Sequence, residues 1–292
     1  MDGILIINKP KGRTSHDIVA KVKRTVGEKV GHTGTLDPNA TGVLPLLIGK
    51  GTLCSQYLME HDKIYEVVLK LGIKTDTADS EGNVIEEKEV TESELSEENV
   101  TKVLESFLGR QEQMPPIYSA IKVNGKKLYE YARRGQSVEI KPREIEIYSC
   151  ELKQINVQEK EICFVVHCSK GTYIRSLCED ISEKLETVGY MKELNRIKVG
   201  KFGIEQAITI EEFENNISNE NFMQAQVISI EKAFEDKNSI VVAENRLKHF
   251  LNGVKLSFEL EDELYRIYDD KNNFIGIGSI KNQFLKREII LE

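Results

Sequence analysis

Apolar and polar residues follow two rhythms at the start of the chain, one typical of strands and one typical of a helix. Residues 3–8 are a short apolar run that suits a buried strand. Ser15 can then cap a helix that continues to about Val26. Residues 31–42 are rich in Gly, Thr, Asp and Pro and have no period, which predicts an ordered loop. Functional sites tend to lie on loops that a rigid scaffold holds, so this loop is the first candidate.

The same patterns predict the remaining elements. The expected strands are 64–71, 118–123, 143–152, 162–168 and 192–202, followed by 265–269, 274–280 and 284–291. The expected helices are 97–108 capped by Ser96, 126–134, one through residue 185 opened by Gly171 and Thr172 with Thr172 as a possible cap, and 244–252. Strands that pair while helices stand apart, without strict βαβ alternation, favour a mixed α+β sheet.

Length and composition indicate two domains. A chain of 292 residues suits one large domain and one small one. Residues 211–220 are rich in Asn and Glu, and the part that follows reads as small and mostly β. We therefore predict domains at residues 1–230 and 231–292.

The composition is that of a soluble globular protein, with 40% hydrophobic and 30% charged residues. No stretch approaches the roughly 20 apolar residues of a membrane helix. The start has neither a basic leader nor a long apolar region, so we expect a cytoplasmic protein. The five cysteines, an odd number, lack C-x-x-C spacing, which predicts reduced packing thiols and no metal site. They are Cys54, Cys150, Cys163, Cys168 and Cys178.

The net charge of −8 argues against nucleic-acid binding only at first sight. Acidic residues concentrate in 86–98, whereas basic residues cluster in 9–24 and 122–143. Such segregation permits a basic face on an acidic protein.

The common cofactor motifs are absent. The GIG at 276–278 lacks the third glycine and following helix of a dinucleotide fingerprint, and the GKGT at 49–52 lacks the spacing of a P-loop. We predict no cofactor. The loop 31–42 reads GHTGTLDPNATG, in which Asp37 precedes a proline and is biased towards extended backbone. Three glycines let such a loop turn tightly and present one carboxylate, although a lone Asp-Pro can also make a simple Asx turn.

This loop resembles the catalytic loop of TruB-type pseudouridine synthases, and four further segments match that family in order. They are NKPKGRTS at 8–15, DKIY at 62–65, KKLYEYAR at 126–133 and SKGTYIR at 169–175. The match covers most of residues 1–205. It implies the pseudouridine synthase fold, an α+β fold with a mixed, largely antiparallel central sheet and flanking helices. The tail resembles the small PUA RNA-binding domain.

The resemblance implies an isomerase that detaches uracil from ribose at N1 and rejoins it through C5, at uridine 55 in the T loop of tRNA. Asp37 would be the catalytic carboxylate and Arg175 its ionic partner. Tyr65 would stack on the uracil and assist loss of the C5 proton. Tyr173 and Leu194 would complete the pocket into which the base is flipped.

The resemblance also implies a surface for the T-arm of tRNA and no obligate protein partner. His32 would contact RNA near the extruded base, and the basic side chains would contact phosphates, which position the substrate without reading its sequence. The residues expected to bind RNA are His32, Lys9, Pro10, Lys126, Lys127 and Arg133. Where the family often has leucine followed by two arginines, this chain has Leu194, Asn195 and Arg196.

Two other functions stay open at this point. The first is a tRNA-binding module or folding chaperone without chemistry. The second is a glycosidase that hydrolyses a nucleoside, which the carboxylate logic supports but for which no second acid is evident. The sequence also leaves open whether Asp37 attacks C1′ or removes a proton from C2′.

Overall fold

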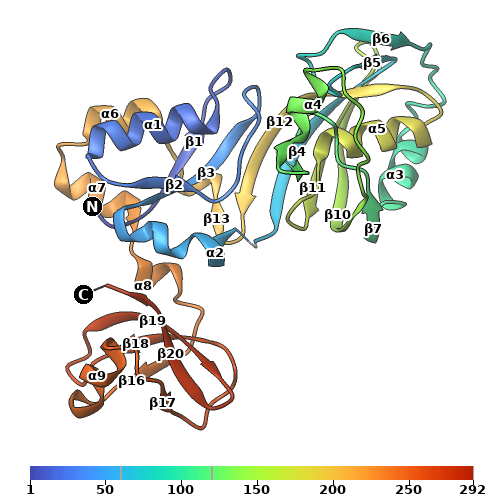
Figure 1. Cartoon of the computed structure of the whole chain (residues 1–292). Helices are drawn as coiled ribbons and strands as arrows, with labels where there is room; N and C mark the ends of the chain where they lie inside the picture. Colours follow the sequence, from blue (N-terminus) through green and yellow to red (C-terminus); the bar gives the residue numbers. More distant parts are fainter. Residues whose placement is uncertain (60, 120, 292) are drawn as a thin grey trace.

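The computed structural model describes residues 1–59, 61–119 and 121–291. Two halves lie side by side and share one large sheet, while a smaller β lobe lies beneath the first half (Figure 1). This arrangement confirms the predicted mixed α+β fold with a small, mostly β C-terminal part.

The elements fall into these three regions. The first half contains β1 (Gly3–Lys9), α1 (Ser15–Val26), β2 (Val30–His32), β3 (Thr41–Ile48), η1 (Gly49–Cys54), α2 (Ser55–Leu58), β13 (Phe202–Gly203), η2 (Ile204–Gln206), β14 (Ile208–Thr209), α6 (Ile210–Asn216), α7 (Glu220–Gln226), β15 (Val227–Ile228) and α8 (Ile230–Ala233). The second half contains β4 (Lys63–Leu71), β5 (Ile73–Thr75), β6 (Val84–Glu87), α3 (Glu97–Glu105), β7 (Gly109–Gln113), β8 (Lys122–Val123), β9 (Lys126–Lys127), α4 (Leu128–Ala132), β10 (Arg143–Asn156), β11 (Glu161–Cys168), α5 (Ile174–Lys184) and β12 (Gly189–Val199). The C-terminal lobe contains β16 (Ser239–Val241), α9 (Glu244–Leu251), β17 (Leu256–Ser257), β18 (Leu264–Tyr268), β19 (Phe274–Lys281) and β20 (Phe284–Ile290).

The large sheet has its seam at β12. The main strand order is β14-β1-β3-β12-β4-β11-β10-β7, and β12 runs parallel to β3 but antiparallel to β4. Arg196 of β12 therefore lies between Gly42 at the start of β3 and Tyr65 on β4. The loop that ends at β3 is thus fixed over the middle of the sheet, where the two halves meet.

Alternation along β1 builds two separate cores. Ile4 and Ile6 face one side of the sheet, and Leu5 and Ile7 face the other, as the two-residue period of a strand requires. Leu5 and Ile7 pack with α1, α6 and α7, whereas the other side packs with α2, α8 and Ile277 and Ile289 of the C-terminal sheet. The C-terminal lobe therefore shares a hydrophobic core with the first half.

The N-cap of the first helix lies one residue before the residue that the sequence predicted. Thr14, not Ser15, is the N-cap, and it forms a capping box with Asp17. The prediction for Ser15 was wrong because its hydroxyl is used elsewhere: it bonds the backbone of Leu36 in the loop before β3.

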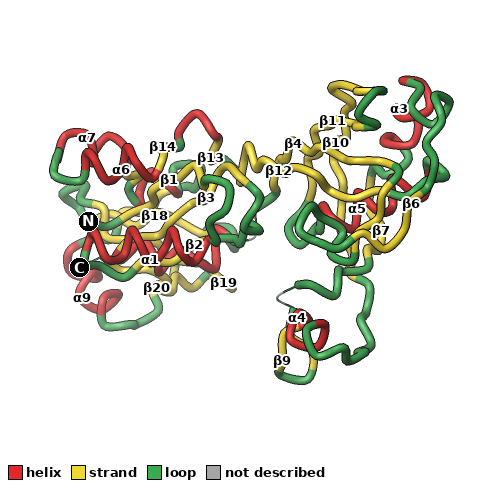
Figure 2. Tube along the Cα trace, turned by 90° about the horizontal axis from the view of Figure 1, so that it is seen from above, coloured by secondary structure: helices red, strands yellow, loops and turns green. Residues whose placement is uncertain are grey.

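Residues 118–134 differ most from the predicted elements. The expected strand 118–123 shrinks to β8, and the expected helix 126–134 becomes the short strand β9 followed by α4. Residue 120 lies outside the described residues. The segment lies away from the sheet (Figure 2), so packing against the sheet does not favour longer regular elements there.

Two helix boundaries also differ. Helix α3 is capped by Ser96, as predicted, but ends at Glu105 instead of residue 108. Helix α5 has Tyr173 as its N-cap, without a side-chain capping bond, because the Thr172 hydroxyl donates to the Ser169 carbonyl at 3.0 Å. Within the described part of the chain, no helix is long and apolar enough to cross a membrane.

Candidate active site

The loop at residues 33–40, which we call the Asp37 loop, is held through its backbone. The Ser15 hydroxyl accepts from the Leu36 N–H at 2.8 Å and lies 3.1 Å from its carbonyl. The Pro38 carbonyl accepts from the Gly12 N–H at 2.9 Å and from the Lys9 ammonium at 3.0 Å. These bonds fix the backbone on both sides of Asp37 and leave its side chain for other contacts.

Lys9 is placed differently from the phosphate contact that the resemblance implies. Its side chain is 0% exposed, and its ammonium donates to the carbonyls of Pro10, Arg13 and Pro38 at 2.9, 2.6 and 3.0 Å. Burial lowers the pKa of Lys9 to about 8. The enclosed ammonium is not open to a phosphate in this structure, and its contacts instead hold the Asp37 loop.

Arg175 is the ionic partner of Asp37. Its Nε lies 3.2 Å from Asp37 Oδ2, and its Nη1 lies 3.6 Å from Asp79 Oδ2. The guanidinium also donates to the carbonyls of Tyr118 at 3.0 Å and Thr77 at 3.4 Å. The Arg175 side chain is 9% exposed and that of Asp37 is 39% exposed, so the carboxylate is open to a ligand while its partner is fixed.

Gln113 positions the start of α5 and therefore Arg175. Its side-chain amide donates to the Tyr173 carbonyl at 3.0 Å and accepts from the Tyr173 N–H at 2.8 Å. This two-way bond replaces a side-chain cap at the helix start. Arg175 is the second residue of α5, so the bond fixes its direction.

A second arginine, Arg196, holds the Asp37 loop from beneath. Its side chain donates to the carbonyls of Gly34, Thr35 and Val43 at 3.1, 3.4 and 2.8 Å. Burial lowers the pKa of Arg196, and the neighbouring Tyr65 phenol, to which it is hydrogen-bonded, raises it.

These side chains surround a pocket of about 880 Å³. Five of the residues predicted for the site line it, namely Asp37, Tyr65, Tyr173, Arg175 and Leu194. They come from the Asp37 loop, β4, β12 and the start of α5. Burial raises the pKa of the Tyr65 phenol, which therefore stays protonated at neutral pH.

His32 and Pro10 lie outside the set of residues that line this pocket. His32 ends β2, and its Nδ1 accepts from the Gly34 N–H at 3.2 Å. Burial lowers the pKa of His32, so the ring is neutral at physiological pH. Pro10 is exposed.

Residues 122–134, which we call the basic segment, reach the pocket through Tyr129. Tyr129 lines the pocket. The Lys127 ammonium and the Arg133 guanidinium each lie 5.3 Å from the centre of its ring, which is within cation–π distance. Lys126 and Arg133 are exposed. The predicted phosphate contacts other than Lys9 are thus gathered beside the mouth of the pocket.

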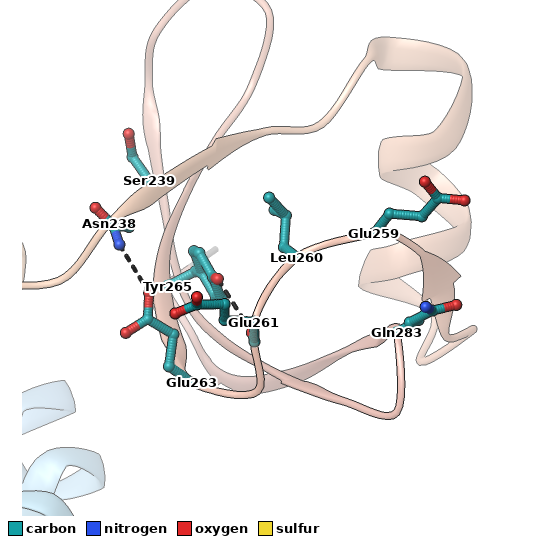
Figure 3. A pocket seen from close by; sticks show the side chains of 8 residues that line it. All are labelled: Asn238, Ser239, Glu259, Leu260, Glu261, Glu263, Tyr265 and Gln283. Atoms are coloured by element: carbon teal, nitrogen blue, oxygen red, sulfur yellow. Dashed lines mark hydrogen bonds between the residues drawn. The ribbon is translucent and has the colours of Figure 1, made fainter.

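A second hollow, of about 830 Å³, lies on the C-terminal lobe and has acidic walls (Figure 3). Glu259, Glu261 and Glu263 line it, and the Glu263 carboxylate accepts from Asn238 at 2.8 Å. Carboxylates repel phosphate, so this hollow is unsuited to nucleic acid.

Sequence reasoning missed the residues that position others. Asp79, Gln113 and Arg196 act on the site through contacts between segments far apart in the chain. Only Arg196 lay in a segment that the sequence had singled out. Within the described residues, no cluster of His, Cys, Asp and Glu is arranged to hold a metal ion.

Two family models match the chain. Residues 21–174 match the TruB family pseudouridylate synthase N-terminal domain, and residues 175–235 match the tRNA pseudouridylate synthase B C-terminal domain. Both Asp37 and Tyr65 lie in the first match, and Arg175 is the first residue of the second.

Curated relatives match over nearly the whole chain. A protein of Clostridium kluyveri named tRNA pseudouridine synthase B is 44% identical over 97% of this chain and 96% of its own length. A protein of the same name from Caldanaerobacter subterraneus subsp. tengcongensis is 42% identical over 98% of both chains.

Among solved structures, a chain in a Cbf5-Nop10-Gar1 complex matches with a TM-score of 0.72 and 24% identity, over 99% of this chain and 84% of that one. A chain in an H/ACA RNP bound to a substrate RNA containing 2′-deoxyuridine matches with the same TM-score, 23% identity, and 99% and 85% coverage. At this identity the likeness establishes the fold.

Proposed function

The chain belongs to the TruB family of pseudouridylate synthases, and we propose that it converts uridine 55 in the T loop of tRNA to pseudouridine with Asp37 as the catalytic carboxylate. The class of reaction, isomerisation of uridine in tRNA, follows from membership of the family. The position of the uridine and the roles of individual residues are our proposal. The observation that carries it is the Asp37–Arg175 ion pair at 3.2 Å inside the pocket.

The reaction breaks the N1–C1′ bond and forms a C5–C1′ bond, and it needs no electron carrier or transferred group. Positive charge develops on the ribose as the first bond breaks, and a carboxylate can stabilise or trap such a centre. Arg175 is a permanent cation and holds the Asp37 carboxylate in place through the ion pair. Asp37 then either attacks C1′ or takes a proton from C2′.

The pocket suits a nucleotide taken out of its stack. A base inside an RNA loop must be extruded before its ribose is accessible. The volume of about 880 Å³ lies within the range of small-molecule sites. Tyr65, Tyr173 and Leu194 line the pocket. Tyr65 would stack on the uracil and assist loss of the C5 proton.

The basic segment would hold the RNA beside the pocket. Lys126, Lys127 and Arg133 carry charges that suit phosphates, while His32 would contact RNA near the vacated base position. We also propose that residues 231–292 form a separate PUA-like RNA-binding domain, following the catalytic domain at 1–230. Its RNA contacts would lie away from the acidic hollow. The proposed partner is the T-arm of cytoplasmic tRNA.

The direct test is incubation of the pure protein with a T-arm stem-loop, followed by digestion to nucleosides and chromatography with mass spectrometry. We expect one pseudouridine per stem-loop, at position 55, and none in a control stem-loop with cytidine there. Release of free uracil would instead identify a glycosidase. Tight binding without a product would identify a chaperone, and either result would overturn the proposed function.

A further inference from the structure

Three arginines line the pocket, and the charges of the two buried ones, Arg175 and Arg196, are balanced differently. Arg175 lies against two carboxylates, Asp37 at 3.2 Å and Asp79 at 3.6 Å. Arg196 has only backbone carbonyls and the Tyr65 phenol as partners, and no described carboxylate lies within 4.0 Å of it. One guanidinium is therefore neutralised by acids and the other is not.

The unbalanced charge of Arg196 is deeply buried. Its side chain is 1% exposed, and an arginine remains protonated at any physiological pH. Three carbonyl dipoles solvate it in part, but a buried cation without an anion is costly, and an apolar side chain often fills such a space at lower cost. The charge projects a positive field into the pocket, because screening there is weaker than in water.

The strand register aims this field at Tyr65. Arg196 of β12 lies directly opposite Tyr65 of β4. Burial raises the pKa of the Tyr65 phenol, and the Arg196 charge lowers it by a smaller amount. The phenol stays protonated and is polarised by the cation, which makes it a stronger hydrogen-bond donor to a base that stacks in the pocket.

The proposed reaction generates an anion that the carboxylate cannot stabilise. When the N1–C1′ bond breaks, the electron pair leaves with uracil and spreads onto its O2 and O4 atoms, while positive charge remains at C1′. Asp37 meets the positive sugar. The negative base requires a cation, and the charge of Arg175 is already matched by Asp37 and Asp79.

We propose that Arg196 is a positioning residue that stabilises the departing uracil anion through the Tyr65 phenol, as the counterpart of Asp37 on the sugar. This inference rests on the proposed function and adds to it. The same guanidinium holds the carbonyls of Gly34 and Thr35, so one side chain both shapes the Asp37 loop and polarises the opposite wall.

The test varies the leaving group. Fluorine at C5 withdraws electrons and stabilises the uracil anion, so a T-arm stem-loop with 5-fluorouridine at position 55 depends less on a cation for cleavage. We compare single-turnover loss of uridine and of 5-fluorouridine at saturating enzyme for Arg196→Gln, Arg196→Lys and the unmutated protein. For uridine we expect Arg196→Gln to be slower by about 100-fold, the scale of one preorganised electrostatic group.

For 5-fluorouridine we expect the loss in Arg196→Gln to be at least several-fold smaller, with Arg196→Lys intermediate on both substrates because its charge survives. The dissociation constant for the stem-loop should change less than about twofold, since Arg196 does not face phosphate. Arg175→Lys is the matched control. Its ionic partner Asp37 acts on the sugar, so the variant's single-turnover rate should fall by the same factor on both substrates.

Equal losses on the two substrates, or an undiminished rate in Arg196→Gln, would overturn the inference. If neither Arg196 variant folds, as judged by circular dichroism, Tyr65→Phe is compared on the two substrates by cleavage of the N1–C1′ bond alone, the step before the C5 proton is lost, because it removes the phenol that links the charge to the base. Equal losses in Tyr65→Phe count against the inference in the same way. Absence of pseudouridine from the unmutated enzyme would overturn the proposed function itself, whereas activity with equal losses would overturn only the role of Arg196.

Discussion

The Asp37 pocket and the basic segment lie side by side but are built in opposite ways. Buried donors hold the pocket through backbone atoms: Lys9, Ser15 and Arg196 all bond carbonyls or N–H groups of the Asp37 loop or its neighbours. The basic segment stands away from the sheet (Figure 2) and exposes Lys126 and Arg133 to solvent. One region holds a single carboxylate through buried hydrogen bonds, whereas the other exposes positive charge that suits a polyanion.

This contrast predicts that chemistry and RNA affinity can be changed separately. Substitutions in the pocket should lower the rate at constant affinity, and substitutions in the basic segment should lower affinity at constant single-turnover rate.

Asp37→Asn should have the largest effect, a loss of about 10³-fold or more in single-turnover rate. A neutral amide can neither attack the ribose, accept its proton nor stabilise its positive charge. The loop should keep its shape, because its bonds to Lys9, Ser15 and Gly12 use backbone atoms. Pseudouridine formation and the dissociation constant are measured on one stem-loop at one salt concentration. Undiminished turnover would sink the assignment of Asp37.

Arg175→Lys should lower the single-turnover rate by about 10²-fold. The charge survives, but one ammonium cannot replace a planar fork that holds Asp37, Asp79 and the carbonyl of Tyr118. Arg110→Lys is the matched control, since Arg110 is an exposed arginine with one ion pair on β7. If both variants keep the wild-type rate, Arg175 supplies only bulk charge.

Alanine at Lys126, Lys127 or Arg133 should weaken tRNA binding severalfold and leave the rate at saturating enzyme nearly unchanged. Each lost phosphate contact should reduce the slope of log affinity against log salt by roughly 0.7 to 0.9. Lys102→Ala on α3 is the control, because that lysine is exposed in another part of the second half. An unchanged salt slope in all three variants would mean that the RNA does not contact the basic segment.

The C-terminal lobe cannot be removed cleanly to separate RNA binding from turnover. Truncation near residue 230 was the obvious way to separate binding from turnover, since the tail carries no proposed catalytic group. Ile277 and Ile289, however, pack in one cluster with Ile4 and Ile6 of β1. Truncation would expose that core, so substitutions on the lobe surface are the cleaner experiment.

The sequence predicted most of the strands, and its motifs identified the family, because those signals lie close together along the chain. They are two-residue alternation, helix caps and ordered motifs. It could not predict which donor meets which carbonyl. Ser15 looked like a helix cap, yet it bonds Leu36, 21 residues away. Arg196 bonds Gly34, 162 residues away in the chain, because β12 pairs with β3 at the seam of the sheet. Contacts of this kind depend on the tertiary fold.

Lys9 is the clearest case of such a contact, and Lys9→Met tests it through protein stability, with no expected change in RNA affinity. Its pKa in the folded protein is about 8, below the ordinary value of 10.5. Below pH 8 both states carry the proton and stability does not depend on this group; between pH 8 and 10.5 the unfolded state holds more protons, so the free energy of unfolding rises with pH. The wild type should gain up to about 3 kcal/mol relative to Lys9→Met across that window. Urea unfolding of both proteins from pH 7 to 10.5 measures the difference, with Lys11→Met at an exposed position as the control. The salt slope of tRNA binding should be the same in Lys9→Met and wild type; a reduced slope, with no pH-dependent difference in stability, would restore Lys9 as a phosphate contact.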